Sequence, residues 1–279
     1  MILVADSGST KTEWWWYNEK NEISKVVTIG FNPYFIDSEG IYTVLKNKLI
    51  PEIDFKNVKK IFFYGSGCSS KENCDIIYNA CRKAFSNAEK IEVRSDTLGA
   101  ARALFGLHKG IAGILGTGSN SVYYDGDDAV EYIPSLGYII ADEGSGARFG
   151  TKLIREYFKG EMPPEIKIAF EMRFHPKLEE ILDAVYRQSH PNRFLASFCD
   201  FLSLHKDHPY IHNLIKAEFH DYLKYQVCKC PDYQHLTLSL VGSVAYFLGD
   251  ILREEANQMG ILVGTILRSP IEGLIRFHK

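Results

Sequence analysis

Hydrophobic and polar positions along the chain fall into segments of two kinds. Short apolar runs bounded by glycine, proline or polar residues predict strands, and longer stretches in which apolar residues return every three to four positions predict helices. The predicted strands span 2–7, 12–18, 23–29, 60–64, 90–94, 110–115, 120–125, 235–241 and 261–267. The predicted helices span 38–50, 71–86, 97–105, 148–158, 245–258 and the tail after Pro270. Strands and helices that alternate in this way are typical of the α/β class.

The opening pattern of the chain returns once. A strand, a glycine turn and a second strand occur from residue 2 and again from residue 111, and this internal repeat predicts two related α/β domains that each open with a hairpin. We place the N-terminal domain at 1–109 and the C-terminal domain at 110–279. Residues 151–230 show helical periodicity broken by prolines, which predicts four or five helices inserted in the second domain. The last helix is a candidate to pack back on the N-terminal domain.

Composition and charge narrow the class of protein. The chain has 279 residues, 46% of them hydrophobic, which suits one large domain or two medium domains with apolar cores. A net charge of −3 gives no sign of the concentrated basic face that nucleic-acid binding needs. No apolar run approaches the roughly 20 residues of a membrane span, and the N-terminus has no signal-peptide pattern. We expect a cytoplasmic protein that binds neither nucleic acid nor membrane.

The cysteines and histidines give no clear metal signature. Six cysteines in a chain of this length do not make a disulfide framework. Cys228 and Cys230 form a close pair without a second pair at zinc spacing, and a structural zinc site normally needs four ligands. His205, His208 and His212 could share a helix face, but Pro209 interrupts that helix. The groups whose metal binding stays open are Cys228 with Cys230, and His205 with His208 and His212.

The first glycine turn, from Asp6 to Thr12, has the composition of a phosphate-binding loop. Asp6 stands at the end of a strand and can hold a magnesium ion directly or through water. Gly8 lets the backbone approach an anion closely, and Lys11 adds a positive charge that suits phosphate. Amides and hydroxyls of the turn can donate to phosphate oxygens, and the candidates are Gly8, Ser9, Thr10, Lys11 and Thr12. For this stretch alone, an ordinary hairpin turn is the alternative.

The second glycine turn repeats this chemistry without the lysine. Its candidate phosphate-binding residues are Gly116, Thr117, Gly118 and Ser119. Two such turns, each opening a domain, can face one another across a cleft and hold a polyphosphate from both sides. The P-loop pattern G-x-x-x-x-G-K-[ST] is absent. Gly65-Ser66-Gly67 follows a strand, but Ser70 stands at the third glycine position, so a dinucleotide-binding loop is not predicted.

Three further segments carry candidate chemistry. Asp96 stands where a strand gives way to a helix, and it is either a helix N-cap or a general base for a substrate hydroxyl. Asp142 and Glu143 lie in a glycine-rich turn, and they either bind sugar hydroxyls or form a solvated capping turn. Gly242 and Ser243 follow a strand and precede a helix, which is a usual position for the base and ribose of a nucleotide.

Taken together and in this order, these five elements resemble the N-acetylglucosamine kinase family. That family belongs to the BadF/BadG/BcrA/BcrD-type ATPases of the actin, sugar-kinase and heat-shock-chaperone fold. The match extends from Asp6 to the tail at Pro270–Gly273. The resemblance implies two ribonuclease-H-like α/β domains that flank a cleft for nucleotide and substrate, with a helical insertion in the second domain. It also implies ATP and Mg²⁺ as cofactors, a small-molecule sugar substrate and a homodimer.

The resemblance also implies roles for individual residues. Asp96 matches the catalytic aspartate, and Asp6 matches the residue that serves magnesium. The two glycine turns match the phosphate loops, and Gly242 with Ser243 looks like the adenosine-binding turn. Matches to sugar-binding residues are Asn32, Asp96, Thr117, Asp142 and Ser145. Two departures are that Ala141 stands where the common sugar segment has glycine, and that Ser7 stands where many relatives have glycine.

The implied reaction is transfer of the γ-phosphoryl group of ATP to a sugar hydroxyl, expected to be the 6-hydroxyl of N-acetylglucosamine or a related amino sugar. One alternative is an ATPase that activates a partner enzyme. That branch carries an iron–sulfur cluster with cysteine ligands, whereas residues 110–150 contain no cysteine. The other alternative is a non-catalytic protein that senses a sugar or a nucleotide. The pattern does not separate one amino sugar or hexose from another.

Overall fold

The computed structural model describes residues 1–8, 10–17, 20 and 22–279. The chain divides into two compact units. The first unit consists of Met1–Lys109, Tyr124–Ala129 and Ser269–Lys279, and the second of Gly110–Tyr123 and Val130–Arg268. The first unit therefore contains both ends of the described chain.

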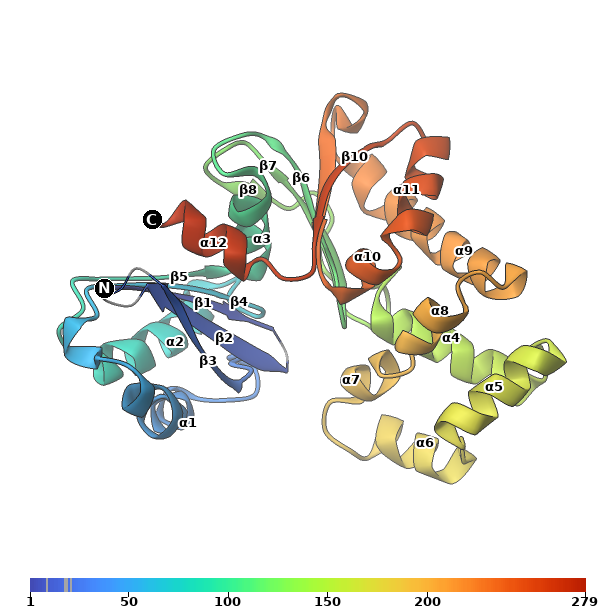
Figure 1. Cartoon of the computed structure of the whole chain (residues 1–279), viewed down its shortest axis with the longest axis horizontal. Coiled ribbons are helices and arrows are strands. Elements are labelled where there is room, and N and C mark those ends of the chain that lie inside the picture. The colour runs from blue at the N-terminus through green and yellow to red at the C-terminus, as the bar shows by residue number, and fades with distance from the viewer. Residues whose placement is uncertain (9, 18–19, 21) are drawn as a thin grey trace. The chain divides into compact units, whose positions relative to one another are not determined.

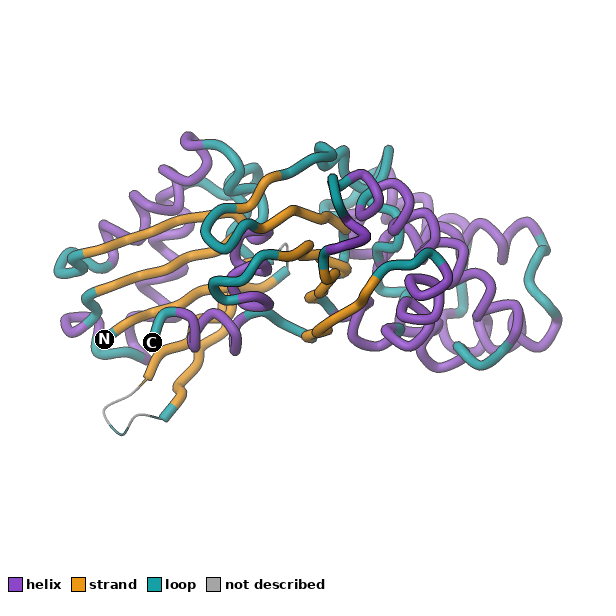
Figure 2. The backbone as a smooth tube through the Cα atoms, turned by 90° about the horizontal axis from the view of Figure 1, so that it is seen from above, coloured by secondary structure: helices purple, strands orange, loops and turns teal. Residues whose placement is uncertain are grey.

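A five-stranded mixed sheet forms the centre of the first unit, in the order β3-β2-β1-β4-β5. Its strands are β1 (Ile2–Ser7), β2 (Lys11–Tyr17), β3 (Ile23–Ile29), β4 (Lys60–Gly65) and β5 (Lys90–Ser95). Strands β1, β4 and β5 run parallel, and β2 pairs antiparallel with both β1 and β3. Figure 2 shows these strands side by side. The predicted strands of this unit are thus present, with ends that differ by about one residue.

Helices cover both faces of this sheet (Figure 1). They are α1 (Ser38–Val44), α2 (Lys71–Ala84), α3 (Asp96–Phe105) and α12 (Ile271–Phe277). One core, which contains the fully buried Trp14, lies on the side of α1 and α2. A second core, in which Val4 packs against Leu274 of α12, lies on the other side. Helix α12 contacts β1, β2 and α3.

The prediction of one continuous helix over 38–50 was wrong. Helix α1 is followed by a π-helical turn at Leu45–Leu49 and a 3₁₀ turn at Ile50–Glu52. Pro51 has no N–H to donate to the carbonyl four residues earlier, so a regular α-helix cannot continue through it. Leu45 and Leu49 are nevertheless fully buried, because the altered turns keep the apolar face of this segment on the core.

The second unit repeats the topology of the first. Its sheet has the order β10-β9-β6-β7-β8, with β6 (Gly110–Leu115), β7 (Ser119–Tyr124), β8 (Ala129–Val130), β9 (Thr237–Val241) and β10 (Leu262–Leu267). Counted along the chain within each unit, both sheets have the strand order third, second, first, fourth, fifth. The internal repeat predicted from the two glycine turns is therefore confirmed at the level of sheet topology.

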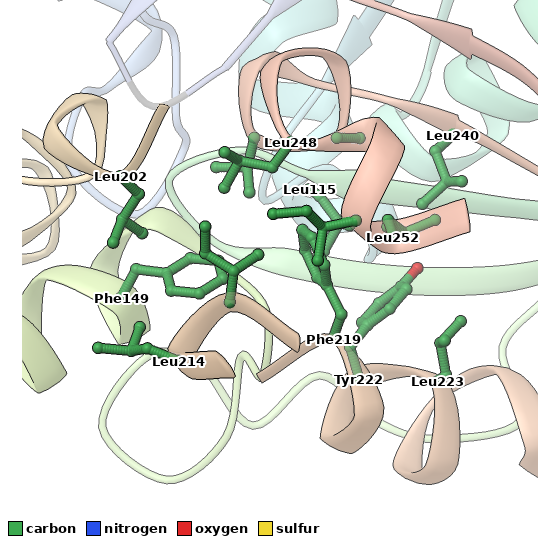
Figure 3. Close-up of a cluster of buried hydrophobic side chains, with 14 of the residues drawn as sticks. Leu115, Phe149, Leu202, Leu214, Phe219, Tyr222, Leu223, Leu240, Leu248 and Leu252 are labelled. Atoms are coloured by element: carbon green, nitrogen blue, oxygen red, sulfur yellow. The ribbon is translucent and has the colours of Figure 1, made fainter. Parts of the chain in front are cut away.

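The helices of the second unit form most of its core. They are α4 (Gly146–Lys159), α5 (Pro164–Phe174), α6 (Leu178–Tyr186), α7 (Pro191–Ala196), α8 (Asp200–His205), α9 (Pro209–Tyr225), α10 (Ser243–Phe247) and α11 (Gly249–Gln258). Phe149, Phe219 and Leu252 belong to this core (Figure 3). Proline opens α5, α7 and α9, as expected where the first backbone N–H needs no helical partner. The helix predicted over 245–258 is split at Leu248, whose backbone leaves the helical region.

No helix in the part of the chain that the structure describes is long and apolar enough to cross a membrane. Within the same residues, no group of three or more His, Cys, Asp or Glu side chains could hold a metal ion. His208 lies at the start of α9, where its side chain pairs with Glu165, and His212 pairs with Glu254.

Candidate active site

The carboxyl ends of three parallel strands meet at one edge of the first sheet. Ser7 at the end of β1 pairs with Gly65 at the end of β4, and Gly65 pairs with Ser95 at the end of β5. The segments that follow these strands therefore begin side by side. The first glycine turn follows β1, Gly65-Ser66-Gly67 lies at the end of β4, and Asp96 follows β5. Ligands of α/β proteins commonly bind outside the carboxyl ends of the strands, so this edge is the candidate site of the first unit.

The first glycine turn is tied to the sheet by its backbone. Gly8 N donates to Lys11 O at 3.0 Å, and Gly30 N donates to Thr10 O at 3.0 Å. A Cβ added to Gly8 would meet no atom within 4 Å. Packing inside the unit therefore does not require glycine here, whereas close approach of a ligand to the backbone would. Ser9, which was also predicted to bind phosphate, lies outside the described residues.

Thr12 has a structural place in this turn. It is fully buried, and its hydroxyl donates to Ile29 O at 3.0 Å. The Thr12 hydroxyl oxygen also lies 2.7 Å from Ser7 Oγ, and Phe31 N donates to Ser7 Oγ at 3.0 Å. The hydroxyls of Ser7 and Thr12 thus join β1 and β2 to the segment after β3. A direct contact of Thr12 with phosphate stays a prediction.

Four charged side chains interact at this edge. Asp6 of β1 pairs across the strands with Glu13 of β2, and Lys11 Nζ lies 2.5 Å from Glu13 Oε1. Burial, the negative charge of Asp96 and that of Glu13 raise the pKa of Asp6 to about 7, against the opposing effect of Lys11. The edge is therefore rich in negative charge. Sequence reasoning missed Glu13, although an acid directly before the aromatic run Trp14–Tyr17 of β2 was the available signal.

A magnesium ion fits this set of donors. Mg²⁺ is usually held by one or two carboxylates and completes its shell with water and substrate phosphates, so a larger protein cluster is unnecessary. Asp6 is a carboxylate whose ionised form is disfavoured by burial and by neighbouring acids. A divalent cation beside it would offset both effects. Asp6 accordingly remains the predicted ligand.

The neighbours of Asp96 resolve one of the open alternatives. The N-cap of α3 is Ser95, whose Oγ accepts from Leu98 N at 3.2 Å. Asp96 is the first residue of the helix, and its Oδ1 accepts from Thr97 N at 2.9 Å. Ser95 is thus the N-cap, and Asp96 accepts from one further amide of the first turn. The negative charge of Asp96 contributes to the raised pKa of Asp6, so the two carboxylates lie close enough at this edge to repel one another.

Asn32 lies against the segment that follows β4. A Cβ added to Gly67, which has a left-handed φ of +82°, would lie 2.7 Å from Asn32 Oδ1. The same Oδ1 accepts from Tyr34 N at 3.0 Å. Glycine at position 67 therefore allows Asn32 to approach the edge that carries Asp96. The hydroxyl of Ser66 in this segment is buried and has no hydrogen-bond partner among the described residues.

In the second unit, the second glycine turn is joined to the segment that opens α4. Gly146 N donates to Gly116 O at 2.8 Å, and Ala147 N donates to Thr117 O at 3.1 Å. A Cβ added to Gly116 would meet nothing within 4 Å. Ser119 is buried, and its hydroxyl finds no partner in the part of the chain that the structure describes. Two carbonyl oxygens of the second glycine turn thus bind it to the first residues of α4.

The predicted sugar segment lies against the same turn. A Cβ added to Gly118 would lie 2.8 Å from Asp142 Oδ2. Asp142 is 8% exposed and has a left-handed φ of 59°. Burial and the charge of Glu143 raise its pKa to about 6, against a backbone hydrogen bond from Ser119. Ser145 caps α4 by accepting from Arg148 N at 3.2 Å, so its contact with a sugar stays a prediction.

The predicted adenosine turn adjoins the second glycine turn. Gly242 has a left-handed φ of +124°, and a Cβ there would lie 2.1 Å from Leu115 O and 3.2 Å from Gly116 N. Ser243 begins α10 and is exposed. Within the second unit, the structure thus brings Gly116, Asp142 and Gly242 together although they are far apart in sequence.

Comparisons with solved structures place the chain in a class. It aligns over 100% of its length with 98% of a putative N-acetylglucosamine kinase from Porphyromonas gingivalis, at 38% identity and a TM-score of 0.94. It aligns at 15% identity and a TM-score of 0.76 with a protein of the same name from Chromobacterium violaceum, covering 100% and 98% of the two chains. A glucokinase from Streptomyces griseus, in complex with glucose and AMPPNP, aligns at 13% identity and a TM-score of 0.54 over 99% and 97%.

The fold is therefore that of the actin-like ATPases and sugar kinases, built from two α/β units. Neither a protein-family model nor a curated protein sequence gives a significant match. The 38% identity extends over nearly the whole of both chains in the first of these alignments. The chain belongs to the N-acetylglucosamine kinase family.

Proposed function

We propose that the protein is an ATP-dependent kinase that transfers the γ-phosphoryl group of ATP to the 6-hydroxyl of N-acetylglucosamine or a related amino sugar. The observation that carries the proposal is the sheet edge where Asp6 and Asp96 interact beside the first glycine turn. Family membership supports the same chemistry. Phosphoryl transfer depends mainly on positioning and charge neutralisation, which suits loops of this kind.

In the proposed reaction, Asp96 accepts the proton of the sugar hydroxyl as that oxygen forms a bond to the γ-phosphorus. The bond between the γ-phosphorus and the bridging oxygen breaks, and ADP leaves with that oxygen. Asn32 and Asp142 would orient the sugar through its hydroxyls. Bound Mg²⁺, held by Asp6, would neutralise phosphate charge.

The remaining residues bind the donor in this proposal. Backbone amides and the Lys11 ammonium of the first turn would bind phosphate oxygens. In the second unit, the residues from Gly116 to Ser119 would do the same, and Thr117 would also contact the sugar. Gly242 and Ser243 would lie against the adenosine. The open space beside Gly8 and Gly116 supports close approach of an anion to both turns.

A panel assay tests the function directly. ADP release is measured with the purified protein, MgATP and a set of sugars that includes N-acetylglucosamine, glucosamine, N-acetylmuramic acid and glucose. We expect strong stimulation by N-acetylglucosamine or a close relative. ATP hydrolysis that is independent of every sugar would contradict a sugar kinase. Iron–sulfur absorbance in the purified protein would instead favour an ATPase that activates a partner.

Replacement of the proposed base tests the mechanism. We expect Asp96→Asn to fold normally and to lose roughly 10²- to 10⁴-fold in kcat, because general base catalysis contributes about that much. Asp75→Asn is the matched control, since the Asp75 side chain is half-exposed in the same unit and forms an i,i+4 ion pair with Lys71. An Asp96→Asn variant that retains more than about a tenth of parental kcat would contradict the base assignment.

A further inference from the structure

Helix α3, whose first residue is Asp96, packs on β4 without an intervening side chain. Gly99 lies three residues after Asp96, and a Cβ added there would lie 2.8 Å from Tyr64 Cβ. Tyr64 is 1% exposed and pairs in register with Asp6 of β1. The start of α3 therefore rests on a residue beside Asp6, so the separation of the two aspartates depends on how closely α3 approaches Tyr64.

The last turn of α3 is held by Arg102. Arg102 Nη1 donates to the Tyr64 hydroxyl at 2.8 Å and to Glu92 Oε1 at 2.9 Å. The side chains of Arg102 and Glu92 are only 12% and 16% exposed, so water competes little for their ion pair. Tyr64 belongs to β4 and Glu92 to β5. One guanidinium thus ties α3 to two of the strands whose ends form the candidate site.

The C-terminal helix α12 completes this connection. A Cβ added to Gly273 would lie 2.5 Å from Ala103 O, so α12 packs directly on the backbone of α3. Arginine can only donate, so the Tyr64 hydroxyl accepts from Arg102 and can donate to His278 Nε2, 2.8 Å away. Burial and the positive charge of Arg102 lower the pKa of His278 to about 4, which leaves its Nε2 able to accept.

We propose that Arg102 is a positioning residue which, with Tyr64 and His278, fixes α3 where the Asp96 carboxylate faces the substrate hydroxyl. The inference rests on the proposed function, in which Asp96 is the general base. Arg102 lies six residues after Asp96, about 9 Å along the helix axis, so it acts on the reaction through the helix. Misplacement of a catalytic group by about 1 Å can cost roughly 10²-fold in rate.

Two substitutions interrupt the network at different points. Tyr64→Phe keeps the buried ring and removes the hydroxyl between Arg102 and His278, whereas Arg102→Gln removes the charged donor. We expect each to lower kcat roughly 5- to 100-fold and to leave KM for ATP within about twofold of the parental value. Arg94→Gln is the matched control, because Arg94 Nε lies 3.5 Å from the same Glu92 Oε1 but Arg94 is 53% exposed on β5. The control should keep parental kcat.

A second background separates positioning from stability. If Arg102 acts through Asp96, Arg102→Gln should change kcat by less than about twofold in the Asp96→Asn protein, because a base that is absent cannot be misplaced. All assays are made below the melting temperature of the least stable variant. A loss of kcat that is equal in both backgrounds overturns the inference, and so does parental kcat in both Tyr64→Phe and Arg102→Gln.

These outcomes are distinct from those of the sugar panel. A parent that phosphorylates a sugar while Tyr64→Phe and Arg102→Gln keep its kcat upholds the kinase and overturns the positioning role. A parent that phosphorylates no sugar overturns the kinase, and amide hydrogen exchange then decides whether Arg102 holds α3. Faster exchange across α3 in Arg102→Gln but not in Arg94→Gln upholds that contact, whereas parental exchange in both variants overturns it.

Discussion

The neighbouring residues affect the two acidic residues Asp96 and Asp142 differently. Ser95 supplies the cap of α3, so the helix does not need the Asp96 carboxylate for that purpose. Asp142, by contrast, is buried in a left-handed conformation beside Glu143, and its pKa is raised to about 6. An aspartate in such surroundings weakens the fold once it ionises, and carboxylates with perturbed pKa values of this kind cluster at functional sites.

Replacing Asp142 with asparagine separates the effect of its charge on stability from its role in sugar binding. Asparagine tolerates a left-handed φ and carries no charge. The folded pKa is raised above the unfolded value, so the carboxylate destabilises the fold increasingly as pH rises from about 4 through 6. We expect Asp142→Asn to be more stable than the parent by about 1–2 kcal/mol at pH 7.5, with the difference vanishing near pH 4.

The same variant should bind the sugar less well. Loss of hydrogen bonds to a charged acceptor predicts a rise in KM for the sugar of about 10-fold or more. Thermal melts between pH 4 and 8 and steady-state kinetics check the two effects. A variant with lower stability at pH 7.5 and an unchanged KM would show that Asp142 serves only the local fold.

At the scale of elements, three glycines at strand ends do different things. Gly8 and Gly116 lie in the two glycine turns, have no left-handed φ, and have open space where a Cβ would be. Gly242 has a left-handed φ, and the carbonyl of Leu115 fills the position of its Cβ. The fold thus requires glycine at position 242, whereas only a ligand would require it at the other two.

Alanine substitutions test this difference. Gly8→Ala and Gly116→Ala should keep or slightly raise the melting temperature, because alanine restricts the unfolded chain. Both should raise KM for ATP, since the methyl group would occupy space that phosphate needs. Gly242→Ala should lower the melting temperature. If the first two variants keep parental KM for ATP, the turns do not hold phosphate closely.

At the scale of the whole molecule, the first unit depends on both ends of the chain. Helix α12 places Ile271, Leu274 and Ile275 in a core with Val4 and Phe62. The ring of His278 stacks on Phe62 with centroids 3.6 Å apart, and its Nε2 lies 2.8 Å from the Tyr64 hydroxyl. A sheet formed early in the sequence is therefore covered on one face by its last residues.

Truncation after Ser269 should destabilise the first unit selectively. Loss of three buried aliphatic side chains predicts roughly 5–9 kcal/mol as an upper estimate, comparable to the stability of a typical domain. Hydrogen exchange should show lost protection in β1 and β4, while β6 and β9 of the second unit stay protected. Equal loss of protection in all four strands would show that the two units do not unfold separately.

Much of this architecture is readable from local pattern. Period-two and period-3.6 hydrophobicity located most strands and helices, and the two glycine turns located the repeat. Failures occurred where local pattern is insufficient. Periodicity continues through residues 45–50 and through Leu248, but Pro51 and a non-helical backbone at Leu248 interrupt the helices. Glu13 was missed because a single strand does not show which side chains lie across from it.

By itself, the sequence determined the order of the elements and the kinds of side chain at the strand ends, because hydrophobic period and glycine conformation act between near neighbours. Only the tertiary structure decided that Asp6 interacts with Asp96, that Asp142 lies against Gly118, and that α12 covers the first sheet. These pairs are set by strand register and by packing between segments far apart in sequence. Such contacts form only when the apolar faces of those segments are buried together.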